Sequence, residues 1–139
     1  MKSIKTKIIN KDNRKMSIAK LIKLASSVIH PVKLGSSFAG SVGCALLSRN
    51  GNVYLGVCID TNSSMGFCAE HNAIGTMITN REYEIKRIVA VWRDKNNNFF
   101  VVPPCGRCRE FMHQINKSNL TTEIILDAST TKLLKELLP

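Results

Sequence analysis

The chain has 139 residues, of which 44% are hydrophobic, and this is the size of one domain with one buried core. No stretch reaches the roughly 20 apolar residues of a membrane span, and the first residues hold no apolar run of signal-peptide length. The sequence therefore argues against a membrane protein. It also argues against a secreted disulfide scaffold, so we expect the five cysteines to be free thiols in a reducing cytoplasm.

The net charge of +10 comes from 20 basic and 10 acidic residues, and half of it lies in residues 1–15. This segment has six basic residues and one acidic residue, a difference of five, and lacks strong hydrophobic periodicity. We therefore expect a basic, flexible segment over 1–15 and a single domain over 16–139. No basic run alternates with aromatic residues as in a platform for single-stranded nucleic acid, so the charge does not favour a nucleic-acid partner.

Hydrophobic spacing and turn residues predict helices that alternate with strands. An apolar stripe of helical period covers 18–29, and Asn50-Gly51 between the apolar runs 42–48 and 52–58 predicts a β-hairpin. This order predicts an α/β fold, a three-layer α/β/α sandwich around a mixed sheet of about five strands. The later predicted elements are a helix that starts at Cys68, strands over 87–92 and 99–102, a helix that starts at Cys105, a strand over 122–126 and a closing helix over 130–138.

Two short motifs, Cys68-Ala69-Glu70 and Pro104-Cys105-Gly106-Arg107-Cys108, supply three thiols and one carboxyl group. Cysteines at i and i+3 lie on one face of a helical turn, so the pair in the second motif can reach one metal ion. Both motifs stand at expected helix starts, where free N–H groups and the helix dipole favour thiolates. Three protein ligands are typical of a catalytic zinc site, which leaves the fourth position to water.

A structural zinc site is the alternative interpretation of the three cysteines. It would need a fourth protein ligand that closes the metal to water, and the sequence offers His71, Cys58 or Cys44 for that position. Glu70 would then have no role, so the catalytic interpretation is favoured. Cys44 lies in an apolar run and is interpreted as a small core residue.

The pairing of C-A-E with P-C-x-x-C resembles the zinc nucleobase and nucleoside deaminases. Cysteine at the first ligand, with Arg109 directly after the second motif, resembles the cytidine deaminase branch, which includes the blasticidin S deaminases. Residues 41–57 are similar to the first hairpin of that branch, and residues 133–139 are similar to its C-terminal helix. The resemblance covers roughly the last 100 residues, about one domain.

The resemblance implies that Cys68, Cys105 and Cys108 bind one zinc ion per subunit and that Glu70 is the proton shuttle. In this reaction a water molecule replaces the amino group at C4 of a cytosine. Glu70 moves the proton of the water to the ring nitrogen beside C4 and then to the departing amine. The expected activity is hydrolytic deamination of cytidine or 2′-deoxycytidine in pyrimidine salvage.

Substrate contacts are implied at further positions. In the family, the backbone N–H at Ala69 meets the base carbonyl, and the backbone C=O at Pro103 holds the leaving amine. Cys58 and Asp60 stand where relatives carry Asn and Glu to bind the ribose hydroxyls. Asp60 keeps the charge on a shorter side chain, whereas a thiol is a weak donor and acceptor. Phe38 is the candidate for the aromatic residue that packs on the base in many relatives.

Arg107 and Arg109 are the candidates for neutralising the thiolates, because His71 stands where relatives often carry arginine for that purpose. The alternative substrate is a related aminonucleoside such as blasticidin S. An RNA-editing deaminase and a non-catalytic zinc module are the remaining, less favoured alternatives. Relatives form tetramers with active sites completed across subunits, so the resemblance implies a homo-oligomer.

Overall fold

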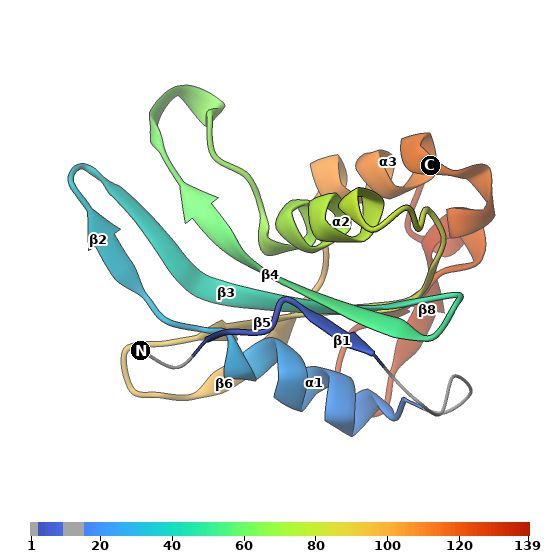
Figure 1. The fold of residues 1–139 in the computed structure, drawn as a ribbon, viewed down its shortest axis with the longest axis horizontal. Helices are drawn as coiled ribbons and strands as arrows, with labels where there is room; N and C mark the ends of the chain where they lie inside the picture. The colour runs from blue at the N-terminus through green and yellow to red at the C-terminus, as the bar shows by residue number, and fades with distance from the viewer. Residues whose placement is uncertain (1–2, 10–15) are drawn as a thin grey trace.

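The computed structural model describes residues 3–9 and 16–139, and its central feature is an eight-stranded sheet with helices on both faces (Figure 1). The predicted three-layer α/β fold is therefore confirmed. The elements are, in chain order, β1 (Lys7–Ile9), α1 (Ile18–Ser27), β2 (Val32–Leu34), β3 (Ser37–Ser48), β4 (Asn52–Asp60), η1 (Asn62–Ser64), α2 (Ala69–Thr79), β5 (Ile85–Arg93), β6 (Phe99–Val102), α3 (Gly106–Ile115), η2 (Lys117–Thr121), β7 (Glu123–Ile125), β8 (Thr131–Leu133) and η3 (Leu134–Glu136).

The sheet is mixed, as predicted, but it has more strands than the five expected. Its order is β1-β4-β3-β5-β7-β8, with β2 paired to β3 and β6 paired to β5. β5 and β7 run parallel, and the other pairs are antiparallel. The unpredicted strands β1, β2 and β8 have three residues each. Such short segments are too brief for an alternating hydrophobic pattern to be recognised.

β3 and β4 form the predicted hairpin, in the middle of the sheet. Gly51 in the connecting turn has φ of 88°, and its N–H donates to the carbonyl of Ser48 at 2.9 Å. A positive φ is favourable for glycine, which explains the Asn-Gly pair at this turn. The register shifts between Ala39 and Gly43 of β3, close to the end of the hairpin that lies beside the site.

Alternate side chains of the central strands fill two separate cores. Leu47, Val53 and Val89 are among the buried residues on the face that α1 covers. Leu46, Tyr54 and Ile88 are among those on the opposite face, beneath α2 and α3. This division explains why β3 and β4 are almost continuously hydrophobic, since both of their faces are covered.

α2 lies so close to the sheet that Gly56 of β4 cannot be replaced without a shift of the helix. A Cβ atom at Gly56 would meet the backbone nitrogen of Ala73 at 2.4 Å and the carbonyl oxygen of Ala69 at 2.9 Å. This close approach places the N-terminal end of α2, where the C-A-E motif lies, directly over β4. The fold thereby fixes the position of the first motif.

Two predictions about the chain ends need correction. Residues 130–138 form β8 and η3 rather than a closing helix. The β-branched Thr131 pairs with Ile125 of β7, and the backbone N–H of Leu133 donates to the Glu136 carboxylate at 2.7 Å, which starts a short 3₁₀ turn. Lys7–Ile9 of the expected tail forms a strand on β4; residues 1–2 and 10–15 of that segment lie outside the described residues. Among the described helices, none is both long and apolar enough to span a membrane.

Candidate active site

The two cysteine motifs lie at the first residues of α2 and α3, as the sequence predicts. Cys68 is the N-cap of α2 and Cys105 is the N-cap of α3. Cys108 lies one turn into α3, and its backbone N–H donates to the Sγ of Cys105 at 3.4 Å. Free N–H groups of two helix ends therefore face the same small volume.

The three cysteine sulfurs form one cluster. The Sγ of Cys105 lies 3.5 Å from that of Cys68 and 3.5 Å from that of Cys108, and all three sulfurs lie within 4.8 Å of one another. Within residues 3–9 and 16–139, this is the one group of three or more potential metal ligands that lie so close together. His71, Cys58 and Cys44, the candidates for a fourth ligand, do not belong to it. The geometry favours an open three-ligand site over a closed four-ligand site.

His71, which the sequence offers as a possible fourth ligand, contacts one thiol of this cluster but is not a member of it. Its Nδ1 lies 3.3 Å from the Sγ of Cys108, and its ring stacks on that of Phe111 with centroids 4.1 Å apart and planes at 3°. Phe111 belongs to α3, so the contact also joins the two helices that carry the motifs. The position of His71 three residues after Cys68, on one face of α2, is the signal that could have indicated this contact.

The two arginines predicted to neutralise the thiolates bind backbone carbonyls instead of sulfur. Arg109 donates to the carbonyls of Pro104 at 2.8 Å and Leu137 at 3.1 Å. Arg107 donates to the carbonyl of Gly66 at 3.3 Å and lines the pocket in front of the cysteines. In the described part of the chain, neither guanidinium donates a hydrogen bond to the three sulfurs. Their role as thiolate-neutralising residues remains a prediction.

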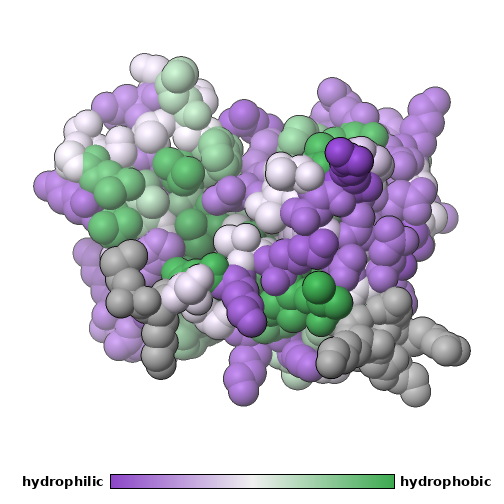
Figure 2. All heavy atoms as spheres, in the orientation of Figure 1, coloured by the Kyte–Doolittle hydropathy of each residue, from purple (hydrophilic) through white to green (hydrophobic). Residues whose placement is uncertain are grey.

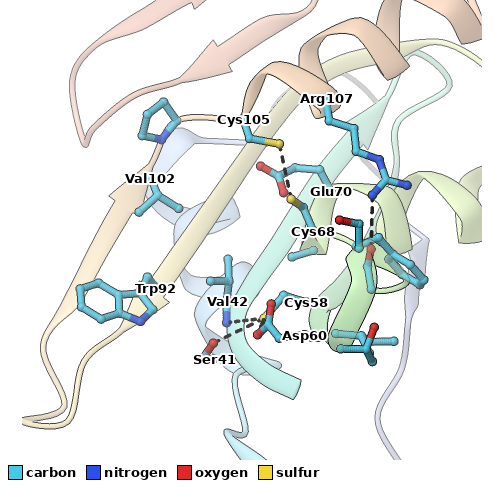
Figure 3. Close-up of a pocket in the computed structure, with 17 residues that line it drawn as sticks. Ser41, Val42, Cys58, Asp60, Cys68, Glu70, Trp92, Val102, Cys105 and Arg107 are labelled. Atoms are coloured by element: carbon cyan, nitrogen blue, oxygen red, sulfur yellow. Dashed lines mark hydrogen bonds between the residues drawn. The ribbon is translucent and has the colours of Figure 1, made fainter. Parts of the chain in front are cut away.

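A cavity of about 570 Å³ opens in front of the cluster and brings most of the predicted site residues together (Figure 3). One end holds the cysteines and the Glu70 carboxyl, and the other end holds Ser41, Cys58 and Asp60. Phe38 does not line this cavity, and 54% of its surface is exposed. The predicted site residues that line the cavity are Cys58, Asp60, Cys68, Ala69, Glu70, Pro103, Cys105 and Arg107.

The carboxyl group of Glu70 is buried, with 5% of its surface exposed, at the same end as the thiols. Burial raises the pKa of Glu70 above its ordinary value, although its own backbone N–H and the thiol of Cys108 oppose the shift. A raised pKa makes a carboxyl group a stronger base, and this is the direction in which general acid–base catalysis shifts such a group.

The far wall of the cavity is a small polar cluster around Cys58. Its Sγ accepts the backbone N–H of Val42 at 3.3 Å and lies 3.4 Å from the Oγ of Ser41. The thiol also points to the Asp60 carboxylate at 3.7 Å. This wall therefore offers a carboxylate and a hydroxyl to a ligand.

Residues 11–123 match the family model described as "Cytidine and deoxycytidylate deaminase zinc-binding region", which covers well over half of the chain. The chain belongs to this family. Among curated relatives, a cytidine deaminase of Mycoplasma genitalium is 33% identical over 81 residues, which are 55% of this chain and 59% of that protein. A cytidine deaminase of Halalkalibacterium halodurans is 36% identical over 76 residues, 53% of this chain and 54% of that protein. The matched segments thus span little more than half of these two deaminases.

Solved structures of cytidine deaminases share the fold over almost the whole chain. The enzyme from Mycobacterium leprae superposes with a TM-score of 0.72 at 23% identity, over 90% of this chain and 99% of that one. The enzyme from Burkholderia pseudomallei gives 0.69 at 23% identity, over 89% and 98%. At this identity the comparison establishes the fold, and it agrees with the three-layer architecture described above.

The thiol cluster fits the zinc ion of this deaminase family. Burial, and next the bond to Cys105, raise the pKa of Cys68 to about 11. Burial also raises the pKa of Cys108, and the nearby Glu70 charge adds to this shift. For Cys105 burial acts in the same direction, but the N–H of Cys108 and the other thiols outweigh it and lower the pKa. All three groups can be thiolates together only beside a cation, and zinc is the cation that such a set selects.

Proposed function

We propose that this protein catalyses the hydrolytic deamination of cytidine and 2′-deoxycytidine, which yields uridine or 2′-deoxyuridine and ammonia. The observation that carries the proposal is the buried Glu70 carboxyl beside the three sulfurs at the thiol end of the cavity. A purely structural metal site has no use for such a carboxyl group. The names of the curated relatives support cytidine rather than blasticidin S as the substrate type.

Each residue at the thiol end of the cavity has one task in this reaction. Cys68, Cys105 and Cys108 would hold the zinc ion, which would supply a Lewis acid that makes water nucleophilic at neutral pH. Glu70 accepts a proton from the water that attacks C4 and transfers it to N3 of the cytosine. The same carboxyl group then takes the proton of the new hydroxyl group at C4 and delivers it to the amino nitrogen, so that ammonia leaves and the C4 carbonyl forms.

Backbone groups that line the cavity hold the base in register with Glu70. The N–H of Ala69, at the free N-terminal end of α2, donates to the base carbonyl. The carbonyl of Pro103, which follows the end of β6, accepts a hydrogen bond from the amino group that leaves. At the far wall Asp60 accepts a hydrogen bond from a sugar hydroxyl, and Cys58 holds Asp60 in place. Phe38, which does not line the cavity, has no part in this proposal.

We also propose that the enzyme works as a homo-oligomer in the cytoplasm and supplies pyrimidine salvage. Figure 2 shows hydrophobic side chains gathered at the end of the molecule where β2 and the loop after β4 project. Leu34 of β2 and Met65 of that loop have 53% and 78% of their surfaces exposed. Such an apolar surface supports association with further copies of the chain. Light scattering during gel filtration measures the oligomeric state.

Ammonia release by the zinc-loaded protein tests the proposed reaction. The substrates are cytidine, 2′-deoxycytidine, cytosine, blasticidin S, adenosine and a short cytosine-containing RNA, and the Glu70→Gln variant is the control. We expect turnover of cytidine and 2′-deoxycytidine, with loss of activity in the control. Release of ammonia from blasticidin S or RNA alone, or full activity of the Glu70→Gln variant, would refute the proposal.

A further inference from the structure

Four residues form a row across neighbouring strands at the open end of the cavity. Phe100 of β6 pairs with Trp92 of β5, and Trp92 pairs with Val42 of β3. The backbone N–H of Val42 in turn donates to the Sγ of Cys58 in β4. Val42 and Cys58 belong to the side of the sheet that α2 and α3 cover, and directly paired residues point to the same face. The row therefore forms a continuous floor beside Cys58 and Asp60.

None of the helices in residues 3–9 and 16–139 covers this floor. α2 begins at Ala69, above Gly56, and the row at Trp92 lies beyond that end of the helix. Trp92 lines the cavity, yet 41% of its surface is exposed, and its ring lies 5.7 Å from that of Phe100 at a tilt of 30°. Among the described residues the indole N–H has no hydrogen-bond partner. A large aromatic surface and a free donor are thus available to a ligand.

The chemistry of the substrate shows which part of it would meet Trp92. In cytosine, N1 lies across the ring from C4. With C4 beside the thiols and Glu70, the group attached to N1 must point towards the opposite end of the cavity. Figure 3 shows Trp92 on that side, level with Val42 and Cys58 and away from Glu70. The sugar of a nucleoside is the group that reaches this floor.

We propose that Trp92 is a specificity-determining residue whose indole ring packs against the sugar of the nucleoside. This inference rests on the proposed deamination of cytidine and names the residue that separates a nucleoside from a free base. Packing on an aromatic face involves the carbon atoms of the sugar and does not depend on a single hydroxyl group. The enzyme should consequently distinguish cytidine from cytosine strongly and cytidine from 2′-deoxycytidine weakly.

Intrinsic fluorescence offers a direct test, because Trp92 is the one tryptophan of the chain. The zinc-loaded Glu70→Gln variant is titrated with cytidine, 2′-deoxycytidine, cytosine and ribose, so that binding is measured without turnover. We expect both nucleosides to change the tryptophan emission in a saturable manner and cytosine to produce a clearly smaller change. No response to cytidine, or an equal response to cytosine at saturation, would overturn the assignment.

Substitutions then measure the contribution of the ring to specificity. Trp92→Ala should lower kcat/KM for cytidine about tenfold, mainly through KM, with little change for cytosine; Trp92→Phe should restore most of the loss. Phe99→Ala is the matched control, because Phe99 is also exposed on this hairpin but points to the other face of the sheet.

An unchanged ratio of cytidine to cytosine activity in Trp92→Ala would contradict the proposal. So would a change in oligomeric state as the sole effect of the substitution, since Trp92 would then belong to a subunit contact. If the proposed deaminase function itself is wrong, the experiments give a different result from a failure of the Trp92 assignment. The wild type would release no ammonia from any pyrimidine, while the fluorescence titration would still report whether a nucleoside contacts Trp92.

Discussion

Glu70 and Glu82 are both buried, with 5% and 8% of their surfaces exposed, yet their surroundings act on them in opposite directions. Burial dominates at Glu70 and raises its pKa. At Glu82 burial also favours the neutral acid, but hydrogen bonds from Ser48, Tyr54 and Asn52 outweigh it and hold the pKa below its ordinary value. Two similar carboxyl groups are thus prepared for different tasks.

The partners of Glu82 show what a structural carboxylate looks like in this fold. Ser48 donates to Oε1 at 2.6 Å, Asn52 donates to Oε2 at 2.9 Å, and the hydroxyl of Tyr54 donates to Oε2 as well. These bonds tie the residues after α2 to the β3–β4 hairpin. Glu70 instead faces a cavity and three thiols. Burial alone therefore does not set the direction in which a carboxyl pKa moves in this fold; the number of hydrogen-bond donors around the group decides it.

The largest difference expected between the surroundings of Glu70 and those of Glu82 is that only the Glu70 site depends on a bound metal ion. Cys105→Ala removes the sulfur that lies between the other two, so the variant should lose bound zinc and all measurable deamination. Zinc content after gel filtration measures the effect. Cys44→Ala is the control, because Cys44 is a fully buried core residue outside the cluster. This variant should keep its bound zinc. Unchanged zinc content in Cys105→Ala would contradict the ligand assignment.

Substitution of each carboxyl group by an amide should separate catalysis from structure. Glu70→Gln should lower kcat by a factor of about 10² to 10⁴, the usual contribution of a general acid–base group, while zinc stays bound. Glu82→Gln should leave kcat within about twofold of the wild type, since Glu82 does not line the cavity. Steady-state ammonia release measures both variants. Comparable losses of kcat in the two variants would contradict the separate roles of Glu70 and Glu82.

The contact between His71 and Cys108 should strengthen zinc binding. His71→Phe keeps an aromatic ring to stack on Phe111 but removes the nitrogen beside the Cys108 sulfur. Loss of such a supporting partner typically weakens metal affinity about 10- to 100-fold, and competition with a chromophoric chelator measures this. Phe111→Leu is the control for the stacking contact, and an equal loss of affinity in that variant would assign the effect to packing.

Glu82→Gln should instead reduce the free energy of unfolding, by about 2 kcal/mol, because hydrogen bonds to a charged acceptor become weaker. Urea denaturation measures the loss. Glu84→Gln is the matched control, since the Glu84 carboxylate is exposed and lies 3.9 Å from Arg49 in a surface ion pair. That substitution should change the stability by less than about 0.5 kcal/mol. A similar loss in both variants would contradict the structural role of Glu82.

The smallest expected effect is the change, in acid, of the stability difference between the wild type and Glu82→Gln. The folded pKa of Glu82 is depressed, so its stabilising contribution is complete above the unfolded value of about 4.3 and is lost as the pH falls through the folded pKa. The stability difference between the wild type and Glu82→Gln should therefore be constant from pH 5 to pH 7 and shrink below about pH 4.3. A difference that grows in acid would contradict this sign.

The sequence predicts the thiol end of the site well and the far end poorly. The C-A-E and P-C-x-x-C motifs are local, so their spacing alone placed Cys68, Cys105 and Cys108 at two helix ends. Trp92 reaches the cavity only because β5 pairs with β3 in one register, which no local pattern reveals. The contact of His71 with Cys108 likewise depends on how α2 and α3 meet.

The same contrast holds for the fold. The Asn-Gly hairpin and the helix expected from the apolar stripe over 18–29 have strong local signals, and both are confirmed. The leucines of residues 130–138 recur at helical spacing and predict a closing helix. In the structure the pairing of β8 with β7 decides the conformation of Thr131–Leu133, and a tertiary contact thus overrides a local preference.

The placement of the three sulfurs on two separate helices couples folding to the supply of metal. Cys68 and Cys105 are joined through β5 and β6, so their sulfurs meet only once the sheet has formed, and the unfolded chain offers no such cluster. A ligand that binds only the folded state stabilises it by mass action, by about 1.4 kcal/mol for each tenfold excess of free ligand over its Kd. Cells short of zinc should therefore lose this protein to proteolysis as well as lose its activity.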